Sequence, residues 1–118
     1  MNKPEFDWDD EFGNFLISLP KKDRAVLLDL IDRVETVGLV SAGKVGWVKS
    51  ITNEKNLYEL RSKLGSNIQR GFYFNVEKET YFITHGFTKK TQKTPSREIE
   101  KAKRIRNRYL EDKQNGKI

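Results

Sequence analysis

The spacing of the hydrophobic residues changes once along the chain, and that change predicts the class of fold. Before Gly38, apolar residues recur every three or four positions, as they do on one side of an α-helix. After Gly46, apolar and polar residues alternate, as they do in a strand with one buried face. The two patterns follow each other within 118 residues, with no repeat or linker between them. The sequence therefore predicts a single α+β domain over residues 1–118.

The helical part of the pattern contains two apolar stripes. Residues 9–19 carry apolar side chains at the i, i+3, i+4 and i+7 positions counted from Phe12, which predicts a short amphipathic helix. Pro20 interrupts it and is well suited to open a second helix, which is expected to stop at Gly38. We expect these two helices to form an antiparallel hairpin with one apolar seam.

Four segments of alternating polarity follow, and short polar breaks separate them. Breaks of this length are typical of hairpins, so we expect a three- to four-stranded antiparallel sheet. The candidate strands are residues 47–51, 57–64, 68–76 and 80–87.

A basic helix is expected after the sheet. Thr94 is its candidate N-cap, and Pro95 falls in its first turn, where proline is tolerated. Ile99, Ala102 and Tyr109 belong to a narrow apolar side, and the other sides are rich in Lys and Arg. The tail at residues 112–118 is expected to fray.

Charge is distributed unevenly along the chain. The formal net charge is +6, from 23 Lys and Arg against 17 Asp and Glu. Residues 1–40 carry five Lys and Arg against nine Asp and Glu, whereas residues 89–118 carry eleven against four. A basic C-terminal quarter is typical of a protein that binds a polyanion on one face. A basic helix that is merely solvated is the alternative.

Several kinds of site are excluded by what the sequence lacks. It has no cysteine, which excludes disulfides, thiol catalysis and cysteine-ligated metals. It has no run of 18 apolar residues for a transmembrane helix, and its acidic N-terminus is unlike a signal peptide. It has no zinc, Walker or dinucleotide motif. We therefore expect a cytoplasmic protein that uses no metal or other cofactor and does not bind a membrane.

Two segments resemble a known family. They read LYELRSKLGSNIQRGFYF at residues 57–74 and YFITHGFTKKTQKTPSREIEKAKRIRNRYL at residues 81–110. Both resemble the HigB-like, phage-derived branch of the RelE/ParE toxin superfamily, and residues 18–38 resemble its helical hairpin. The resemblance implies a RelE-like fold and a toxin of a type II toxin–antitoxin system, an endoribonuclease that cuts mRNA during translation on the ribosome. It also implies a cognate antitoxin, expected to be a helix-turn-helix DNA-binding protein.

RNA cleavage without a metal sets three chemical requirements. A base takes the proton of the 2′-hydroxyl, cations stabilise the pentacovalent phosphate, and an acid protonates the leaving 5′-oxygen. Alternation places Glu59, Arg61 and Lys63 on one face of their strand. Arg61 is thus a candidate catalytic cation and Lys63 a candidate phosphate ligand. Glu59 is either the ion-pair partner of Arg61 or a base.

Arg70 is a further candidate, because the resemblance aligns it with a phosphate-contacting arginine of the family. Alternation puts Arg70 on the same face as Ile68, Phe72 and Phe74. An arginine on an apolar face needs a partner or an exit to solvent. The neighbouring Gly71 favours a twist or bulge that would let the side chain reach solvent.

The turn at residues 88–93 concentrates three lysines just before a helix N-terminus, a place that attracts anions. Lys89 and Lys93 are candidate RNA phosphate ligands, and Lys90 is a candidate catalytic cation once the family motif is considered. Like charges in a cluster also lower the pKa of a lysine. A solvated loop with no role is the alternative.

His85 is the only histidine of the chain. Its ordinary pKa of about 6.5 suits acid–base catalysis. Alternation groups it with Tyr81, Ile83 and Phe87, so a satisfied core residue is the alternative.

The acid and base of the reaction stay open. Some ribosome-dependent relatives carry a tyrosine near the start of the last helix, where this chain reads SREI at residues 96–99.

Two other functions stay open as well: a ParE-like inhibitor that binds DNA gyrase without chemistry, and a basic nucleic-acid-binding accessory domain. The antitoxin either covers the basic face or docks on the acidic helical hairpin, and the hairpin is favoured.

Overall fold

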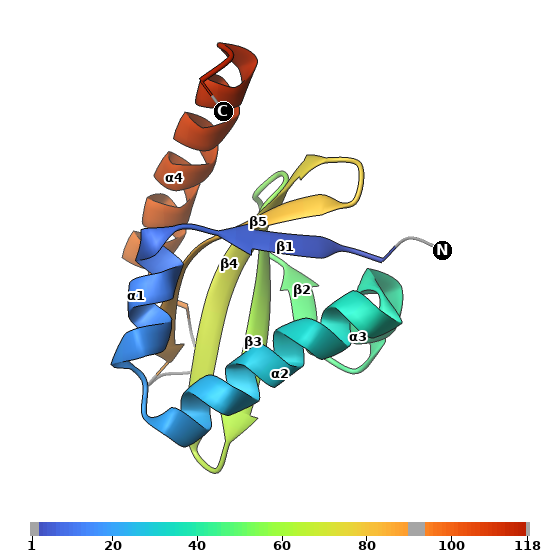
Figure 1. Ribbon diagram of the computed structural model, residues 1–118, viewed down its shortest axis with the longest axis vertical. Coiled ribbons are helices and arrows are strands. Elements are labelled where there is room, and N and C mark those ends of the chain that lie inside the picture. Colours follow the sequence, from blue (N-terminus) through green and yellow to red (C-terminus); the bar gives the residue numbers. More distant parts are fainter. Residues whose placement is uncertain (1–2, 90–93, 118) are drawn as a thin grey trace.

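The computed structural model describes residues 3–89 and 94–117, and these residues fold into a sheet with helices on both faces (Figure 1). The elements in chain order are β1 (Glu5–Trp8), α1 (Asp10–Ser18), α2 (Lys21–Val37), α3 (Leu39–Lys44), β2 (Val48–Ser50), β3 (Tyr58–Leu64), β4 (Asn67–Glu77), β5 (Thr80–Lys89) and α4 (Ser96–Gln114).

The sheet has five strands in the order β1-β5-β4-β3-β2. The strands β2 to β5 pair antiparallel, as expected, but β1 pairs parallel to β5. The expected antiparallel sheet of three or four strands is therefore corrected to a mixed sheet of five. The added strand is stabilised by Phe6, which is buried and packs edge-on against Tyr73 with ring centroids 5.1 Å apart.

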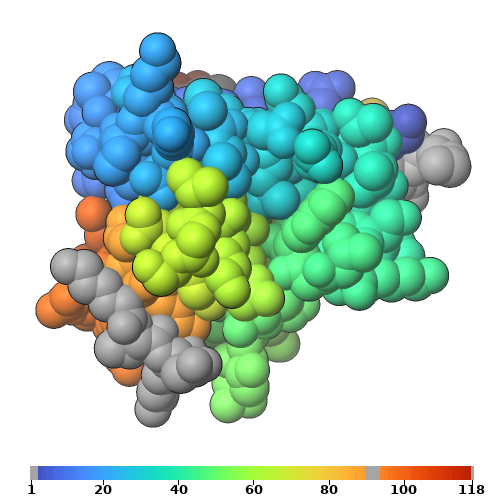
Figure 2. All heavy atoms as spheres, turned by 90° about the horizontal axis from the view of Figure 1, so that it is seen from below, coloured from blue at the N-terminus to red at the C-terminus, as the bar shows by residue number. Residues whose placement is uncertain are grey.

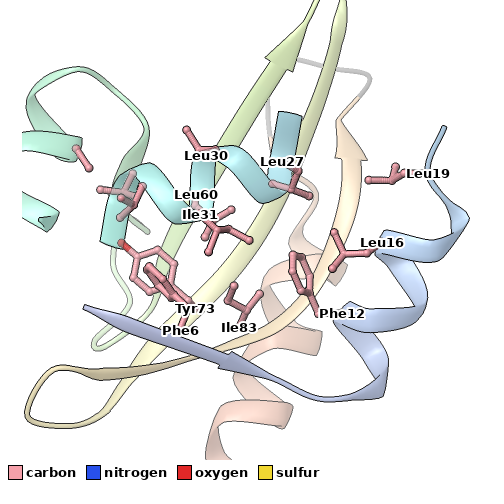
Figure 3. Packing of buried hydrophobic residues seen from close by; sticks show 13 residues of the cluster. Phe6, Phe12, Leu16, Leu19, Leu27, Leu30, Ile31, Leu60, Tyr73 and Ile83 are labelled. Carbon is pink, nitrogen blue, oxygen red and sulfur yellow. The ribbon is translucent and has the colours of Figure 1, made fainter. Parts of the chain in front are cut away.

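Three helices cover one face of the sheet. Side chains from α1, α2 and the sheet form a single core there, in which Phe12, Leu27 and Leu60 are fully buried (Figure 3). The expected hairpin of α1 and α2 needs a correction. Each helix packs chiefly on the sheet, α1 on β5 and α2 on β3, instead of on the other helix.

The glycine-containing stretch after α2 is helical, which the sequence did not predict. Gly38 has a φ of 89°, a conformation that favours glycine, and it ends α2 by donating from its backbone N–H to the Val34 carbonyl. The chain then turns directly into α3, where Ala42 is fully buried.

The opposite face of the sheet carries α4. Ala102 is buried against Phe72, and Tyr109 lies on Phe82 with ring centroids 4.5 Å apart, so the expected apolar side of this helix is confirmed. Two details differ from expectation. Pro95, not Thr94, occupies the N-cap position, and the helix continues to Gln114 instead of fraying from residue 112.

A bulge in β5 changes which side chains share a face. Phe72 pairs with His85 and the next residue, Tyr73, pairs with Ile83, so Thr84 is an extra residue in β5. Beyond the bulge the alternation is shifted by one. His85 consequently lies on the α4 side of the sheet, whereas Ile83 belongs to the core under α1 and α2. The expectation that these two residues share a face was wrong.

Within residues 3–89 and 94–117, none of the helices combines the length and the apolar character that crossing a membrane requires.

Candidate functional site

Basic side chains from four strands gather on the α4 side of the sheet, beyond the part that α4 covers. Strand register explains the gathering, because Lys49 pairs with Glu59, Arg61 with Arg70, and Ile68 with Lys89. Directly paired residues point to the same face of a sheet. These residues form a cationic face, which consists of Lys49, Arg61, Lys63, Arg70 and Lys89.

One buried carboxylate lies within the cationic face. Glu59 and Arg70 form an ion pair, and their side chains are only 1% and 3% exposed. Glu59 also lies 3.8 Å from Lys49 Nζ and accepts a hydrogen bond of 3.3 Å from the Thr94 hydroxyl. The partner of Glu59 is therefore Arg70, and not Arg61 as one sequence interpretation had it.

The positive charge of Arg70 is compensated by an ion pair with Glu59, and the side chain does not reach solvent. The expected exit near Gly71 was wrong, since the guanidinium stays buried on Glu59. Its Nε has no hydrogen-bond partner among the described residues. A buried donor without an acceptor is uncommon in folded proteins. Like the rest of the guanidinium, this nitrogen is withdrawn from solvent.

Arg61 and Lys63 are the accessible cations of β3. Both are exposed, and Arg61 Nε donates to the Gly46 carbonyl at 3.2 Å, which fixes the guanidinium at the edge of the sheet. Arg61 lies directly across the ladder from Arg70. Glu59 neutralises the buried Arg70, whereas the exposed guanidinium of Arg61 is open to an anion from solvent.

Lys89 ends β5 next to this cluster. Partial burial and then the positive charge of Arg70 lower the pKa of the Lys89 ammonium, with Lys49 and Arg61 acting in the same direction and Glu59 opposing them. The direction is the one expected for a lysine in a group of like charges. Lys89 consequently gives up its proton more readily than an ordinary surface lysine.

A chain of polar contacts supports the end of β5. The Thr88 hydroxyl donates to Gln69 Oε1 at 2.7 Å, and Gln69 Nε2 lies 3.5 Å from Asp23 Oδ1 at the start of α2. Gln69 and Asp23 are buried. These contacts tie the segment that carries Lys89 to β4 and α2.

His85 lies away from solvent, between the sheet and the first turn of α4. Its Nε2 is 3.1 Å from Glu98 Oε1 and its Nδ1 is 3.0 Å from the Thr84 hydroxyl. Burial lowers the pKa of the imidazole, and this effect outweighs the opposing hydrogen bond to Glu98. The surroundings of His85 are those of a residue that anchors α4 to the sheet.

The structure thus brings together Glu59, Arg61, Lys63, Arg70 and Lys89 and separates His85 from them. Lys90 and Lys93 lie outside the described residues.

Sequence reasoning missed Lys49 and Thr94 as site residues, and both of them approach Glu59. Alternation within residues 47–51 could have indicated Lys49. Among the described residues there is no group of three or more His, Cys, Asp or Glu that could hold a metal ion.

The comparison with protein families is decisive for the class of this chain. The family described as Phage derived protein Gp49-like (DUF891) matches residues 14–107. The chain belongs to this family. The matched segment includes the whole cationic face. A search of curated protein sequences finds no match.

Two solved structures show that this Gp49-like protein has a RelE-like fold. One belongs to an archaeal RelE–RelB complex from Pyrococcus horikoshii OT3, with 20% identity, a TM-score of 0.51, and coverage of 73% of this chain and 93% of that chain. The other is a mutant of the E. coli toxin RelE in the free state, with 18% identity, a TM-score of 0.54, and coverage of 73% and 82%. The predicted RelE-like α+β fold is confirmed.

Proposed function

We propose that this Gp49-like protein is the toxin of a type II toxin–antitoxin system and cleaves mRNA on the ribosome without a metal ion. The cationic face is the observation that carries the proposal. It gathers three exposed cations (Lys49, Arg61 and Lys63), one buried arginine and a lysine of lowered pKa on one part of the sheet. The RelE-like fold and the family are consistent with this function. That the toxin belongs to the HigB-like branch of the RelE/ParE superfamily is part of this proposal.

The cationic face suits the developing charge of the reaction. When the 2′-hydroxyl attacks the phosphate, negative charge grows on the phosphate oxygens, and hydrogen bonds from cations strengthen as it grows. Arg61 is positioned to reach such a phosphate from solvent, and the buried Arg70 adds its positive charge from directly across the ladder. We assign Lys89 to proton transfer or phosphate binding, because its lowered pKa serves either role.

Glu59 is assigned a supporting role in this proposal. A base must reach the 2′-hydroxyl, and the side chain of Glu59 is 1% exposed and already paired with Arg70. Its charge holds Arg70 in place and reduces the repulsion among the cations. Lys90 stays a candidate catalytic cation, and Lys93 a candidate phosphate ligand.

Mapping the 5′ ends of cellular mRNA after expression tests the function. New ends in phase with codons are expected for the wild type, and none for Arg61→Ala at an equal soluble level. Lys44→Ala is the matched control, because Lys44 is an exposed lysine of α3 outside the cationic face. Intact mRNA together with broken or supercoil-altered DNA would instead indicate the ParE-like gyrase inhibitor.

A partner antitoxin is part of the same proposal. The RelE neighbour from Pyrococcus horikoshii was solved in a complex with RelB. We expect the product of an adjacent gene to bind this chain on the helices α1 and α2, which together carry six Asp and Glu against four Lys and Arg. Calorimetry with Asp32→Lys, an exposed position of α2, should show weaker binding than with Lys89→Glu. The opposite ranking would place the antitoxin on the cationic face.

A further inference from the structure

An open groove of about 370 Å³ lies between α2 and the β3–β4 hairpin. Seen from below, the hairpin tip in yellow-green stands on the surface beside the blue helix α2 (Figure 2). The floor and walls include Trp47, Leu30 and Ile68, and most of the lining is apolar. A volume of this size is within the range of small-ligand sites, which are mostly apolar with a few polar groups.

The polar groups of the groove are mainly cationic. Arg33, Arg61 and Lys63 contribute three positive charges, and Asp29 is the one carboxylate among the lining residues. Asp29 is itself paired with Arg33 at 2.7 Å, and both are about 60% exposed. The groove therefore combines an aromatic wall with a net positive rim. This combination fits an unpaired nucleotide, which has an apolar base face and an anionic phosphate.

The groove is continuous with the cationic face through Arg61. This side chain belongs to both, since it lines the groove and lies across the ladder from Arg70. A strand of RNA with its reacting phosphate at Arg61 therefore has the groove next to it. An apolar protein segment would gain nothing from the net positive rim, so the charge favours RNA as the occupant.

We propose that the groove is a nucleoside subsite, in which the base next to the reacting phosphate stacks on Trp47 while Lys63 holds the flanking phosphate. This inference rests on the proposed ribonuclease function and adds where the neighbouring nucleotide binds. It assigns Trp47 and Lys63 to substrate binding, not to the chemical step.

The two tryptophans of the chain give a direct test. Trp47 lines the groove beside β2 at one edge of the sheet, whereas Trp8 lies in β1 at the other edge and packs edge-on against Phe12 at 5.3 Å. The wild-type protein is titrated with a single-stranded 2′-O-methyl RNA trinucleotide, which cannot be cleaved. The indole N–H resonances are followed by NMR. We expect the Trp47 signal to shift in a saturable way and the Trp8 signal to stay unchanged.

Variants separate stacking from charge. Trp47→Phe keeps an aromatic wall and should retain binding, whereas Trp47→Leu should weaken it about tenfold, since base stacking is worth roughly 1–3 kcal/mol. Trp47 also packs against the core, so folding of both variants is checked by thermal melting. Lys63→Ala tests the rim without touching the core and should weaken binding several-fold. Lys44→Ala should have no effect.

The outcomes distinguish the subsite from the proposed function. If the amide signals of Arg61 and Lys89 shift with RNA while Trp47 stays silent, the subsite is overturned and the ribonuclease proposal stands. If no signal shifts and no new mRNA ends form in cells, both are overturned. A Trp47 shift caused only by the protein product of an adjacent gene would assign the groove to a protein partner and overturn the subsite.

Discussion

Arg70 on β4 donates a hydrogen bond to Glu59 on β3, and both side chains are almost completely withdrawn from solvent. The register places Arg61 opposite Arg70, so Glu59 lies diagonally across the ladder from its partner. Removing one member of a buried pair leaves the other charge uncompensated. The pair is therefore a structural element of the cationic face as well as a part of its electrostatics.

Glu59→Gln should destabilise the fold strongly. The substitution keeps the size of the side chain but leaves the Arg70 guanidinium buried without a counter-charge, a loss of about 3–5 kcal/mol in the free energy of unfolding. Urea denaturation measures it. Asp29→Asn is the matched control, because it breaks the exposed Asp29–Arg33 pair and should cost less than about 1 kcal/mol. Equal losses for the two variants would contradict the structural role of Glu59.

Arg61→Ala and Arg70→Ala should differ although both remove a cation. Arg61 is exposed, so its removal should lower the rate of mRNA cleavage about a hundredfold, or roughly 3 kcal/mol of barrier, with little change in stability. Arg70→Ala also leaves Glu59 buried without its partner, so activity and stability should fall together. Toxicity after induction and thermal melting at equal soluble levels measure the two effects.

Lys44→Ala should behave as the wild type in both assays, since Lys44 is exposed and lies outside the cationic face. Arg61→Ala cells that die as fast as wild-type cells would show that Arg61 does not contribute to toxicity.

The sequence predicted the parts of this fold that local periodicity controls. The helices α1, α2 and α4 and the strands β3, β4 and β5 follow directly from apolar spacing. The strand β1 was missed because it has only four residues and pairs with a segment about 75 positions later. Such a pairing leaves no local signal.

The sequence predicted which residues belong to the site, but not which of them contact one another. Alternation identified Arg61 as a candidate and the family resemblance identified Arg70, but the partner of Glu59 depends on the register of β3 against β4, which the sequence does not reveal. The bulge at Thr84 likewise has no sequence signal, and it alone moves His85 to the α4 side of the sheet. A shift of one residue exchanges the two faces of a strand.

His85 should make the stability of the fold depend on pH. Burial lowers its pKa in the folded state below the unfolded value of about 6.5, so the unfolded chain binds the proton more readily. Stability should therefore be fully present above that value and decrease as the pH falls below it. Glu98 and Glu11 oppose this trend and Lys101 reinforces it.

Urea midpoints at pH 7.5 and pH 5.5 measure the effect of His85. The wild type should lose more stability between these two pH values than His85→Gln does, because glutamine does not titrate. The same loss in both proteins would show that other groups cause the dependence.

Gly86 should not tolerate even a methyl side chain without a loss of stability. It lies on β5 under α1, and a Cβ built there falls 2.3 Å from Phe15 Cδ2 and 2.5 Å from Phe15 Cε2. No real side chain accepts such an approach, so Gly86→Ala must displace the Phe15 ring and should cost about 2–3 kcal/mol. Urea denaturation measures the loss.

Gly43→Ala is the matched control for Gly86→Ala. The space beside Gly43 in α3 is open, so alanine should stabilise the fold by about 0.5–1 kcal/mol. Adding Phe15→Leu to Gly86→Ala should recover part of the loss, because the smaller side chain makes room for the methyl group. No recovery in the double variant would mean that the contact with Phe15 is not the cause.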